Sequence, residues 1–110
     1  MVIYSPKRGD VVWLEFDPQK GKEIQKTRPA LTISPQQYNQ KTGMGLFIPI
    51  TSKIKGYPFE VLLEVEEIKG ALLCDQVRSL DWKARKARFV ATLPPSIVAD
   101  ALAKFQVLLD

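Results

Sequence analysis

Histidine is absent from this chain of 110 residues, and its absence narrows the possible chemistry more than any other feature of the composition. Catalytic triads and dyads in which a histidine imidazole activates a nucleophilic serine or cysteine are therefore excluded. The usual zinc sites built from histidine and cysteine are excluded too. Any proton transfer by the chain would therefore fall to aspartate, glutamate, lysine, tyrosine or arginine.

Cysteine and long apolar runs are also scarce. Cys74 is the one cysteine, so no disulfide can form within the chain, and a reducing compartment is expected. The N-terminal segment lacks the apolar core of a secretory signal, and no apolar run approaches the ~20 residues needed to span a bilayer. We therefore expect a cytoplasmic protein with no membrane partner.

The remaining composition is that of one ordinary globular domain, which we place at residues 1–110. Apolar residues make up 45% of the chain and charged residues 25%, as in soluble proteins with a packed core. The net charge of +4 is mildly basic, and basic residues gather at 20–28 and 78–88. If the fold joins these two segments, they would form a groove for a polyanionic partner.

A polar stretch at residues 21–29 separates two apolar runs typical of strands, at 11–16 and 30–33. It carries more charge than a connecting loop needs for folding. Pro29 disfavours helical geometry at Arg28 and is tolerated at the first position of a strand. The pattern predicts Arg28 at the start of a strand beside a loop, a setting where residues that do chemistry are often held. A solvated hairpin loop is the alternative.

Runs of β-branched and aromatic residues between turn signals predict the strands. We expect them at residues 10–16, 30–34, 44–50, 59–63 and 71–80, with a helical turn at 36–40 and brief pairing at 89–93. Apolar residues spaced along one helical face predict a helix at 95–109 that begins near Pro95. The fold class is therefore mainly β with some α, a small bent antiparallel sheet or open barrel with a C-terminal helix.

Laid out in this order, the chain resembles the MazF/PemK family of toxin endoribonucleases from bacterial type II toxin–antitoxin systems, and its MazF branch most. Each matching segment is weak alone, but their order and spacing along the chain are specific. The segments are Arg8-Gly9-Asp10-Val11-Val12-Trp13, Phe16-Asp17-Pro18, Gly21-Lys22-Glu23, Arg28-Pro29-Ala30, Ser34-Pro35 with Tyr38-Asn39, Pro49-Ile50-Thr51, Lys55-Gly56-Tyr57-Pro58-Phe59-Glu60-Val61, Asp75-Gln76-Val77-Arg78-Ser79-Leu80 and the terminal helix.

The resemblance implies an SH3-like barrel of the kind shared with the CcdB gyrase poisons, working as a homodimer. It implies cleavage of single-stranded RNA, including mRNA, at short sequence motifs, with neither a metal nor a cofactor. It also implies that the activity arrests growth, and that a small, acidic cognate antitoxin neutralises the toxin by blocking the site. DNA would be contacted only indirectly, through that antitoxin.

Metal-free RNA cleavage uses the 2′-hydroxyl of the substrate as the nucleophile, and the family match assigns roles to three residues. Arg28 would hold the phosphate and stabilise its transition state, since a guanidinium grips phosphate oxygens bidentately. The hydroxyl of Thr51 would bond a phosphate oxygen or the attacking hydroxyl. Glu23 would be the general base or would orient Arg28, and Asp75 is the competing base. Leu73 stands where relatives of the PemK type carry a catalytic arginine, which favours the Arg28 and Thr51 pair.

Further polar residues are candidates for contacts with RNA. Asp75 and Gln76 would read base edges, and the basic side chains would contact the backbone. We interpret Trp13 as core or dimer interface and place Trp82 weakly in an RNA or antitoxin groove. The RNA-binding candidates are Lys22, Ser52, Lys55, Asp75, Gln76, Arg78 and Arg85.

Two other functions remain open on the same barrel. One is a noncatalytic toxin that binds a protein target, as a gyrase poison does, and the other is a nucleic-acid-binding module that does not cut. The combination of Arg28-Pro29 with Pro49-Ile50-Thr51 favours the endoribonuclease, because a binding protein has no need of that juxtaposition.

Overall fold

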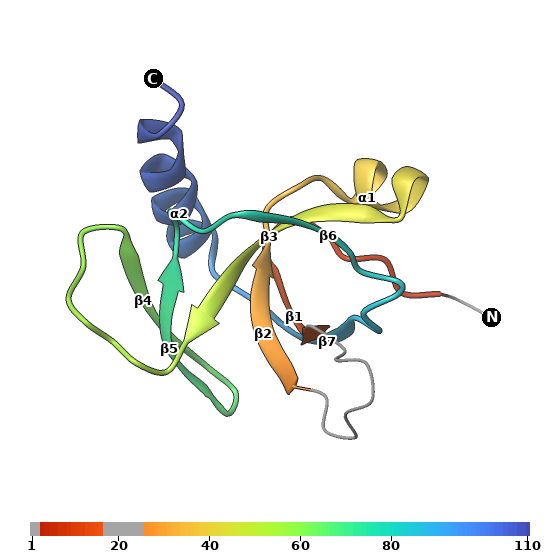
Figure 1. Cartoon of the computed structure of the whole chain (residues 1–110), viewed down its shortest axis with the longest axis horizontal. Helices are drawn as coiled ribbons and strands as arrows, with labels where there is room; N and C mark the ends of the chain where they lie inside the picture. Colours follow the sequence, from red (N-terminus) through yellow and green to blue (C-terminus); the bar gives the residue numbers. More distant parts are fainter. Residues whose placement is uncertain (1–2, 17–25) are drawn as a thin grey trace.

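A computed structural model describes residues 3–16 and 26–110 of the chain. In this part of the chain, two strands, a short helix and five further strands precede the C-terminal helix (Figure 1). The strands are β1 (Asp10–Phe16), β2 (Lys26–Thr32), β3 (Met44–Thr51), β4 (Glu60–Val65), β5 (Ile68–Leu73), β6 (Arg78–Asp81) and β7 (Arg88–Thr92). The helices are α1 (Gln36–Thr42) and α2 (Pro95–Val107).

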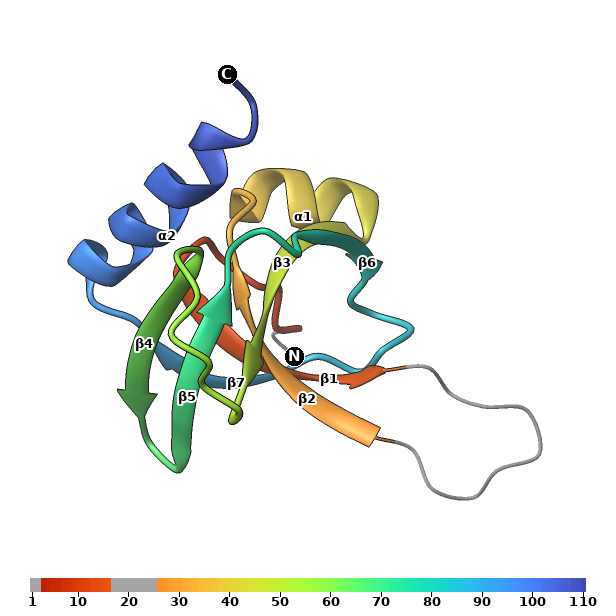
Figure 2. The same cartoon turned by 60° about the vertical axis from the view of Figure 1, so that its left-hand side comes forward.

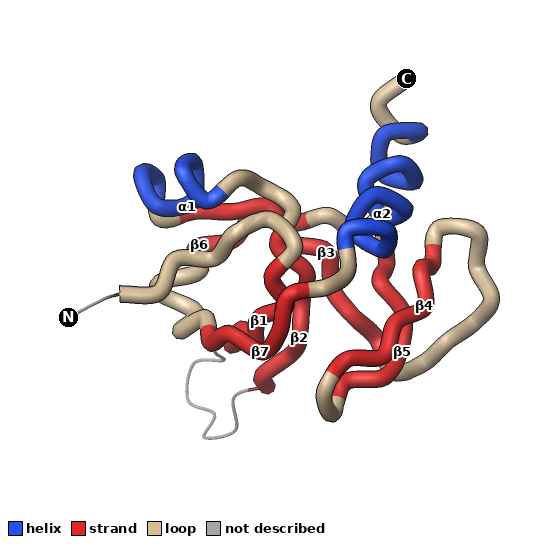
Figure 3. The backbone as a smooth tube through the Cα atoms, turned by 180° about the vertical axis from the view of Figure 1, so that it is seen from behind, coloured by secondary structure: helices blue, strands red, loops and turns tan. Residues whose placement is uncertain are grey.

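The strands form one curled antiparallel sheet in the order β4-β5-β3-β2-β1-β7, and β6 also pairs with β3. Along one edge β3 pairs with β2; along the other it pairs first with β6 and then, at Ile50 and Thr51, with β5. Figures 1 and 3 show the β4–β5 hairpin on one side of β3 and strands β1, β2 and β7 on the other. The central strand β3 thus joins two halves of the sheet, which confirms the predicted bent sheet with a C-terminal helix.

The core lies on both faces of the sheet because side chains alternate along each strand. On β1, Val11 packs in the larger cluster, with side chains of α2, whereas Val12 packs in a smaller cluster on the opposite face. Trp82 belongs to that smaller cluster, and its indole N–H donates to the backbone oxygen of Asn39 at 3.1 Å. With 3% of Trp82 exposed, the interpretation of this tryptophan as part of a groove was wrong.

The predicted strand at 71–80 is interrupted in the structure. A turn follows β5, in which the N–H of Gln76 donates to the backbone oxygen of Leu73 at 2.9 Å, and pairing resumes in β6. Both pieces lie along the same edge of the bent β3. The chain must turn between them to follow that bend, and neither glycine nor proline marks the turn.

Other element boundaries moved by a few residues. The strand predicted at 30–34 begins at Lys26, so Arg28 lies within β2 rather than at its start. The predicted helical turn at 36–40 extends to Thr42 and ends at Gly43, whose φ of 74° is left-handed. The predicted helix at 95–109 is α2, with Pro95 at its first turn as expected.

Both helices lie at one end of the molecule, and the ends of β1 and β2 at Phe16 and Lys26 lie at the other, as the views in Figures 1 and 2 agree. Val98 and Ala101 bury one face of α2 against the sheet, while Val107, Leu108 and Leu109 at its C-terminal end are exposed. Neither helix in the described part of the chain has the length and apolar character needed to cross a membrane.

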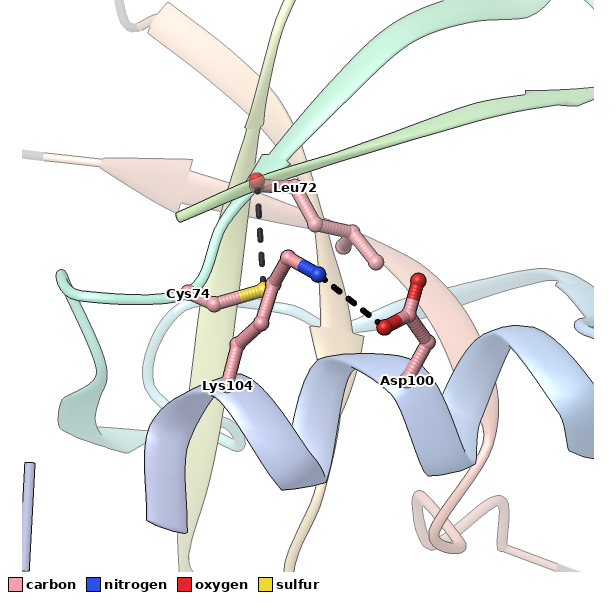
Figure 4. Close-up of polar contacts among 4 residues, drawn as sticks. All are labelled: Leu72, Cys74, Asp100 and Lys104. Carbon is pink, nitrogen blue, oxygen red and sulfur yellow. Dashed lines mark hydrogen bonds and ion pairs between the residues drawn. The ribbon is translucent and has the colours of Figure 1, made fainter. Parts of the chain in front are cut away.

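Cys74 is fully buried under α2, beside the ion pair that Lys104 makes with Asp100 at 3.1 Å (Figure 4). Burial raises the pKa of the Cys74 thiol to about 11, and the ammonium of Lys104 opposes part of that rise. The folded state therefore holds the thiol proton more tightly than the unfolded chain. The resulting contribution to stability is complete below pH 9 and is lost as the pH rises toward 11.

We expect Cys74 to be inert in the folded protein. A rise of about two pH units in the pKa lowers the thiolate population about 100-fold at pH 8, and burial blocks access in addition. Ellman's reagent should therefore label the native protein over hours and the guanidinium-unfolded protein within seconds to minutes. Rapid stoichiometric labelling of the native protein would contradict this placement.

Candidate active site

The candidate site is a hollow where β2 and β3 separate. β2 pairs with β3 only from Ala30 to Thr32, so the edge of β2 at Arg28 and Pro29 is open on that side. Pro29 has no N–H to donate, which suits a strand segment with one unpaired edge. The cavity there has a volume of about 440 Å³. Its lining includes Trp13, Arg28, Thr51, Ser52, Lys53 and Lys69.

Arg28 reaches this hollow from a rigid strand. It lies opposite Leu14 of β1, whose side chain is fully buried in the smaller core cluster. Arg28 itself is exposed. A buried partner strand therefore fixes its backbone, while its guanidinium stays accessible to a ligand.

Thr51, the last residue of β3, also lines the hollow. Its hydroxyl oxygen accepts the N–H of Lys53 at 3.1 Å, a local bond common for threonine at strand ends. Thr51 pairs with Ala71 of β5, and the next residue back, Gly70, lies against the backbone of Thr51. A Cβ at position 70 would overlap the carbonyl oxygen of Thr51 and lie 2.9 Å from its carbonyl carbon. Gly70 is thus what allows β5 to hold Thr51 this closely.

A second hollow of about 210 Å³ adjoins the first, and Thr51 and Lys53 line both. Its other walls come from the β3–β4 loop, the ends of β4 and β5, and the turn that follows β5. They include Lys55, Tyr57, Glu60 and Gln76. One continuous polar surface therefore runs from Arg28 past Thr51 to Gln76.

Asp75 does not line the second hollow but contacts one of its lining residues, Tyr57. The hydroxyl of Tyr57 donates to Oδ2 of Asp75 at 3.2 Å, and the carboxylate raises the pKa of Tyr57 above its ordinary value. Oδ1 of Asp75 is buried and has no hydrogen-bond partner among the described residues. A buried acceptor left without a donor is costly, so a ligand donor at this oxygen would be favourable.

The predicted site residues divide between these places. Arg28, Thr51 and Ser52 share the first hollow, and Lys55 and Gln76 line the second. Arg78 and Arg85 line neither; the guanidinium of Arg85 donates to the backbone oxygen of Glu15 at 3.1 Å. Lys22 and Glu23 lie outside the described residues.

The sequence reasoning missed the contribution of the β4–β5 hairpin. Glu67 and Lys69 line the first hollow because the pairing of β3 with β5 brings that hairpin beside Thr51. No local pattern at these residues indicates this pairing. Trp13, interpreted as core or interface, is half-buried: it packs partly against the larger core cluster and also lines the hollow. Among the described residues, no three aspartate, glutamate or cysteine side chains gather as metal ligands would.

The charges of the first hollow indicate what it binds. Arg28, Lys53 and Lys69 outnumber Glu67 around a polar cavity, which favours an anion such as a phosphate group. The fold and site thus define a small curled-sheet protein with a candidate phosphate-binding hollow. Residues 7–109 match the family model described as the PemK-like, MazF-like toxin of type II toxin–antitoxin systems, and the chain belongs to this family.

Relatives and solved structures agree with this family. The chain is 47% identical over 106 residues to the endoribonuclease toxin MazF of Escherichia coli K12, with 96% of each chain covered. It is 32% identical to the endoribonuclease PemK of Escherichia coli, with 94% of this chain and 81% of PemK covered. The MazF fold in a crystal structure of MazE–MazF from Deinococcus radiodurans superposes with a TM-score of 0.90 at 44% identity, covering 97% of each chain.

Proposed function

We propose that this protein is an endoribonuclease toxin that cleaves single-stranded RNA by attack of the substrate 2′-hydroxyl, without a metal ion or cofactor. Membership of the family makes it an RNA-cleaving toxin that an antitoxin neutralises. The observation that carries the mechanistic proposal is that Arg28 and Thr51, from two different strands, line one basic hollow.

In the proposed reaction, the deprotonated 2′-oxygen attacks the adjacent phosphorus, the bond to the 5′-oxygen of the next nucleotide breaks, and this leaving oxygen takes up a proton from water. The products are a 2′,3′-cyclic phosphate and a 5′-hydroxyl. Arg28 donates to the phosphate oxygens, on which negative charge grows in the five-coordinate transition state. The permanent charge of the guanidinium supports this electrostatic role and makes it a poor proton donor.

Thr51 and one carboxylate complete the proposed set of catalytic residues, with Glu23 and Asp75 as the alternatives for the carboxylate. The Thr51 hydroxyl donates to a phosphate oxygen or to the attacking hydroxyl, since its proton is not used in the bond from Lys53. Glu23 takes the proton of the 2′-hydroxyl or orients Arg28. Asp75 is the less favoured base because it contacts Tyr57 and does not line the hollow that holds Arg28.

The second hollow supports a role in binding RNA beside the scissile phosphate. Ser52, Lys55 and Lys22 would contact the sugar–phosphate backbone, together with Arg78 and Arg85 from the β6–β7 side. Gln76 and the unpartnered oxygen of Asp75 offer hydrogen-bonding groups to base edges. We therefore propose that sequence selectivity resides here. Exchange of Asp75 for Asn would alter the preferred motif rather than abolish cutting.

The proposed antitoxin is small and acidic and occupies the same basic surface. The crystal structures of MazE–MazF from Deinococcus radiodurans support an antitoxin partner for this chain. An acidic segment matches the charge of Arg28, Lys53 and Lys69. We propose that the protein acts in the cytoplasm and meets DNA only through that antitoxin.

We also propose a homodimer formed through the C-terminal part of α2. A groove of about 510 Å³ between α2 and the segment leading into α1 is lined mainly by apolar side chains, including Ile33, Leu46, Leu102, Phe105 and Leu109. Leu109 is 62% exposed. An apolar groove that continues onto exposed leucines is typical of a surface that pairs with a partner.

Leu109→Glu should therefore separate the dimer without unfolding the chain, because Leu109 is exposed in the single subunit. Light scattering after size-exclusion chromatography should give the mass of one chain for this variant and of two chains for the parent. Ala103→Glu, on the exposed face of the same helix, is the matched control and should stay dimeric. A parent that is monomeric at all concentrations would refute the proposed dimer.

The function is tested by incubating single-stranded RNA with the protein in EDTA and mapping the ends of the products. The proposal predicts cleavage at a short recurring motif, unaffected by EDTA, with 5′-hydroxyl ends. Binding of RNA without any cleavage would favour the nucleic-acid-binding module instead. Toxicity in cells with neither binding nor cleavage of RNA would favour a toxin directed at a protein target.

A further inference from the structure

Glu60, at the start of β4, holds the backbone of the preceding loop through its carboxylate. Oε1 accepts the N–H of Gly56 at 3.0 Å and that of Lys55 at 3.2 Å, and the N–H of Tyr57 is 3.4 Å away. Oε2 also lies 3.2 Å from the N–H of Lys55. Three successive amides thus converge on one side chain.

This arrangement resembles the backbone concavities that bind anions. Successive N–H groups point to one side when a residue takes left-handed geometry, as Gly56 does with a φ of 77°. Here the anion is supplied by the protein itself. Hydrogen bonds from amides to a charged acceptor are stronger than those to a neutral one, so Glu60 defines the conformation of residues 55–57.

The loop that Glu60 holds forms one wall of the second hollow. Lys55, Tyr57 and Glu60 itself line that hollow together with Thr51. Among the described residues, a second side-chain contact of residues 55–57 runs from the hydroxyl of Tyr57 to Asp75. When Oδ1 of Asp75 engages a base, as proposed above, Oδ2 keeps its contact with Tyr57, and Glu60 is the side chain that holds the backbone of residues 55–57.

We infer that Glu60 is a positioning residue for RNA binding: it fixes residues 55–57 so that Lys55 and Tyr57 face the substrate beside Thr51. This inference rests on the proposed function and deepens it. Glu60 would not touch the reacting atoms, so its loss should weaken the binding of RNA rather than slow the chemical step.

The direction in which loss of Glu60 changes RNA binding distinguishes a positioning role from a purely electrostatic effect of its charge. A carboxylate near a phosphate-binding surface repels the substrate, so its removal alone would tighten binding. Removal of the positioning contact would weaken binding instead. Glu64 provides the matched control, because it lies on β4 with the same side-chain direction as Glu60 and is exposed away from both hollows.

The experiment compares Glu60→Ala, Glu60→Gln and Glu64→Ala in the full chain. Steady-state cleavage of single-stranded RNA should show KM raised about tenfold in Glu60→Ala, the factor expected from losing hydrogen bonds to a charged group, with kcat within about twofold. Glu60→Gln keeps one acceptor oxygen, so its KM should lie between those of the parent and Glu60→Ala. Glu64→Ala should leave KM unchanged or lower it.

Amide hydrogen exchange, measured by NMR in the absence of RNA, tests whether Glu60 holds the backbone amides of residues 55–57. The N–H groups of Lys55 and Gly56 should be protected in the parent and exchange faster in Glu60→Ala. Unprotected amides in the parent, or a KM lowered in Glu60→Ala, would overturn the inference. Failure of the proposed function would appear separately, as a parent that cuts no RNA. A parent that also binds no RNA, with the amides still protected, would overturn the assignment of the contact to RNA binding.

Discussion

Arg28→Ala is expected to lower the rate of RNA cleavage by at least ~10² to 10³-fold, the usual cost of losing one donor to a transition-state oxyanion. The effect should fall on kcat, because the charge on the phosphate oxygens grows only as the 2′-oxygen attacks. Growth arrest on expression in bacteria should disappear with it. The melting temperature should shift by a few degrees at most, because the side chain is exposed and no described residue depends on it for packing.

Two comparisons make this prediction specific. Arg28→Lys keeps the charge but not the bidentate geometry, so it should recover only part of the rate. Arg88→Ala removes another exposed arginine, from β7, which lines neither hollow, and the variant should cut RNA at nearly the parental rate. A large loss of melting temperature in Arg28→Ala would instead show that this arginine has a structural role.

Gly70→Ala should damage both stability and catalysis, although position 70 touches no substrate. The added Cβ overlaps the carbonyl oxygen of Thr51, so β3 and β5 must move apart at the point where they pair. We expect a loss of about 1 to 3 kcal/mol in the free energy of unfolding, as for other overpacked sites. The displaced Thr51 should lower kcat by one to two orders of magnitude, roughly what a misplacement of about 1 Å costs elsewhere.

Gly43→Ala is the control that separates lost stability from lost geometry. Gly43 has a φ of 74° and open space around its Cα, so alanine there strains the backbone without meeting a neighbour. It should destabilise the fold by about 1 kcal/mol and leave kcat unchanged, because it lies at the end of α1. If Gly70→Ala retained full kcat despite its instability, Thr51 would not depend on the contact with β5.

The fold was predictable where the signal is local. The 3.6-residue spacing of apolar side chains after Pro95 predicted α2, and β-branched runs predicted β1 and β3 nearly to the residue. The break between β5 and β6 was not predictable, because it follows the bend of β3 and no turn residue marks it. Trp82 was misread because Lys83 and Lys86 nearby are exposed, whereas Trp82 itself packs in a cluster with side chains of β1, β2, β3 and β6.

For the candidate site, the sequence suggested residues but not their arrangement. Arg28 and Thr51 were proposed from the segments around Pro29 and Pro49, and both line one hollow in the structure. The family resemblance carried that prediction, since the two residues are far apart in sequence. Lys69 and Gly70 depend on which residues of β5 lie opposite Thr51. Pairing register of this kind arises from the packing of the whole sheet, so no short stretch of the sequence predicts it.

The central claim is that the RNA supplies its own nucleophile while Arg28 and Thr51 stabilise the phosphate. The most direct test uses an RNA with one mapped cleavage site and replaces the nucleotide 5′ to the scissile phosphate by its 2′-deoxy form. The account predicts that this substrate binds with nearly unchanged affinity, stays uncut in EDTA and inhibits cleavage of the all-RNA form. Cleavage of the deoxy substrate at the same phosphate and a similar rate would contradict it.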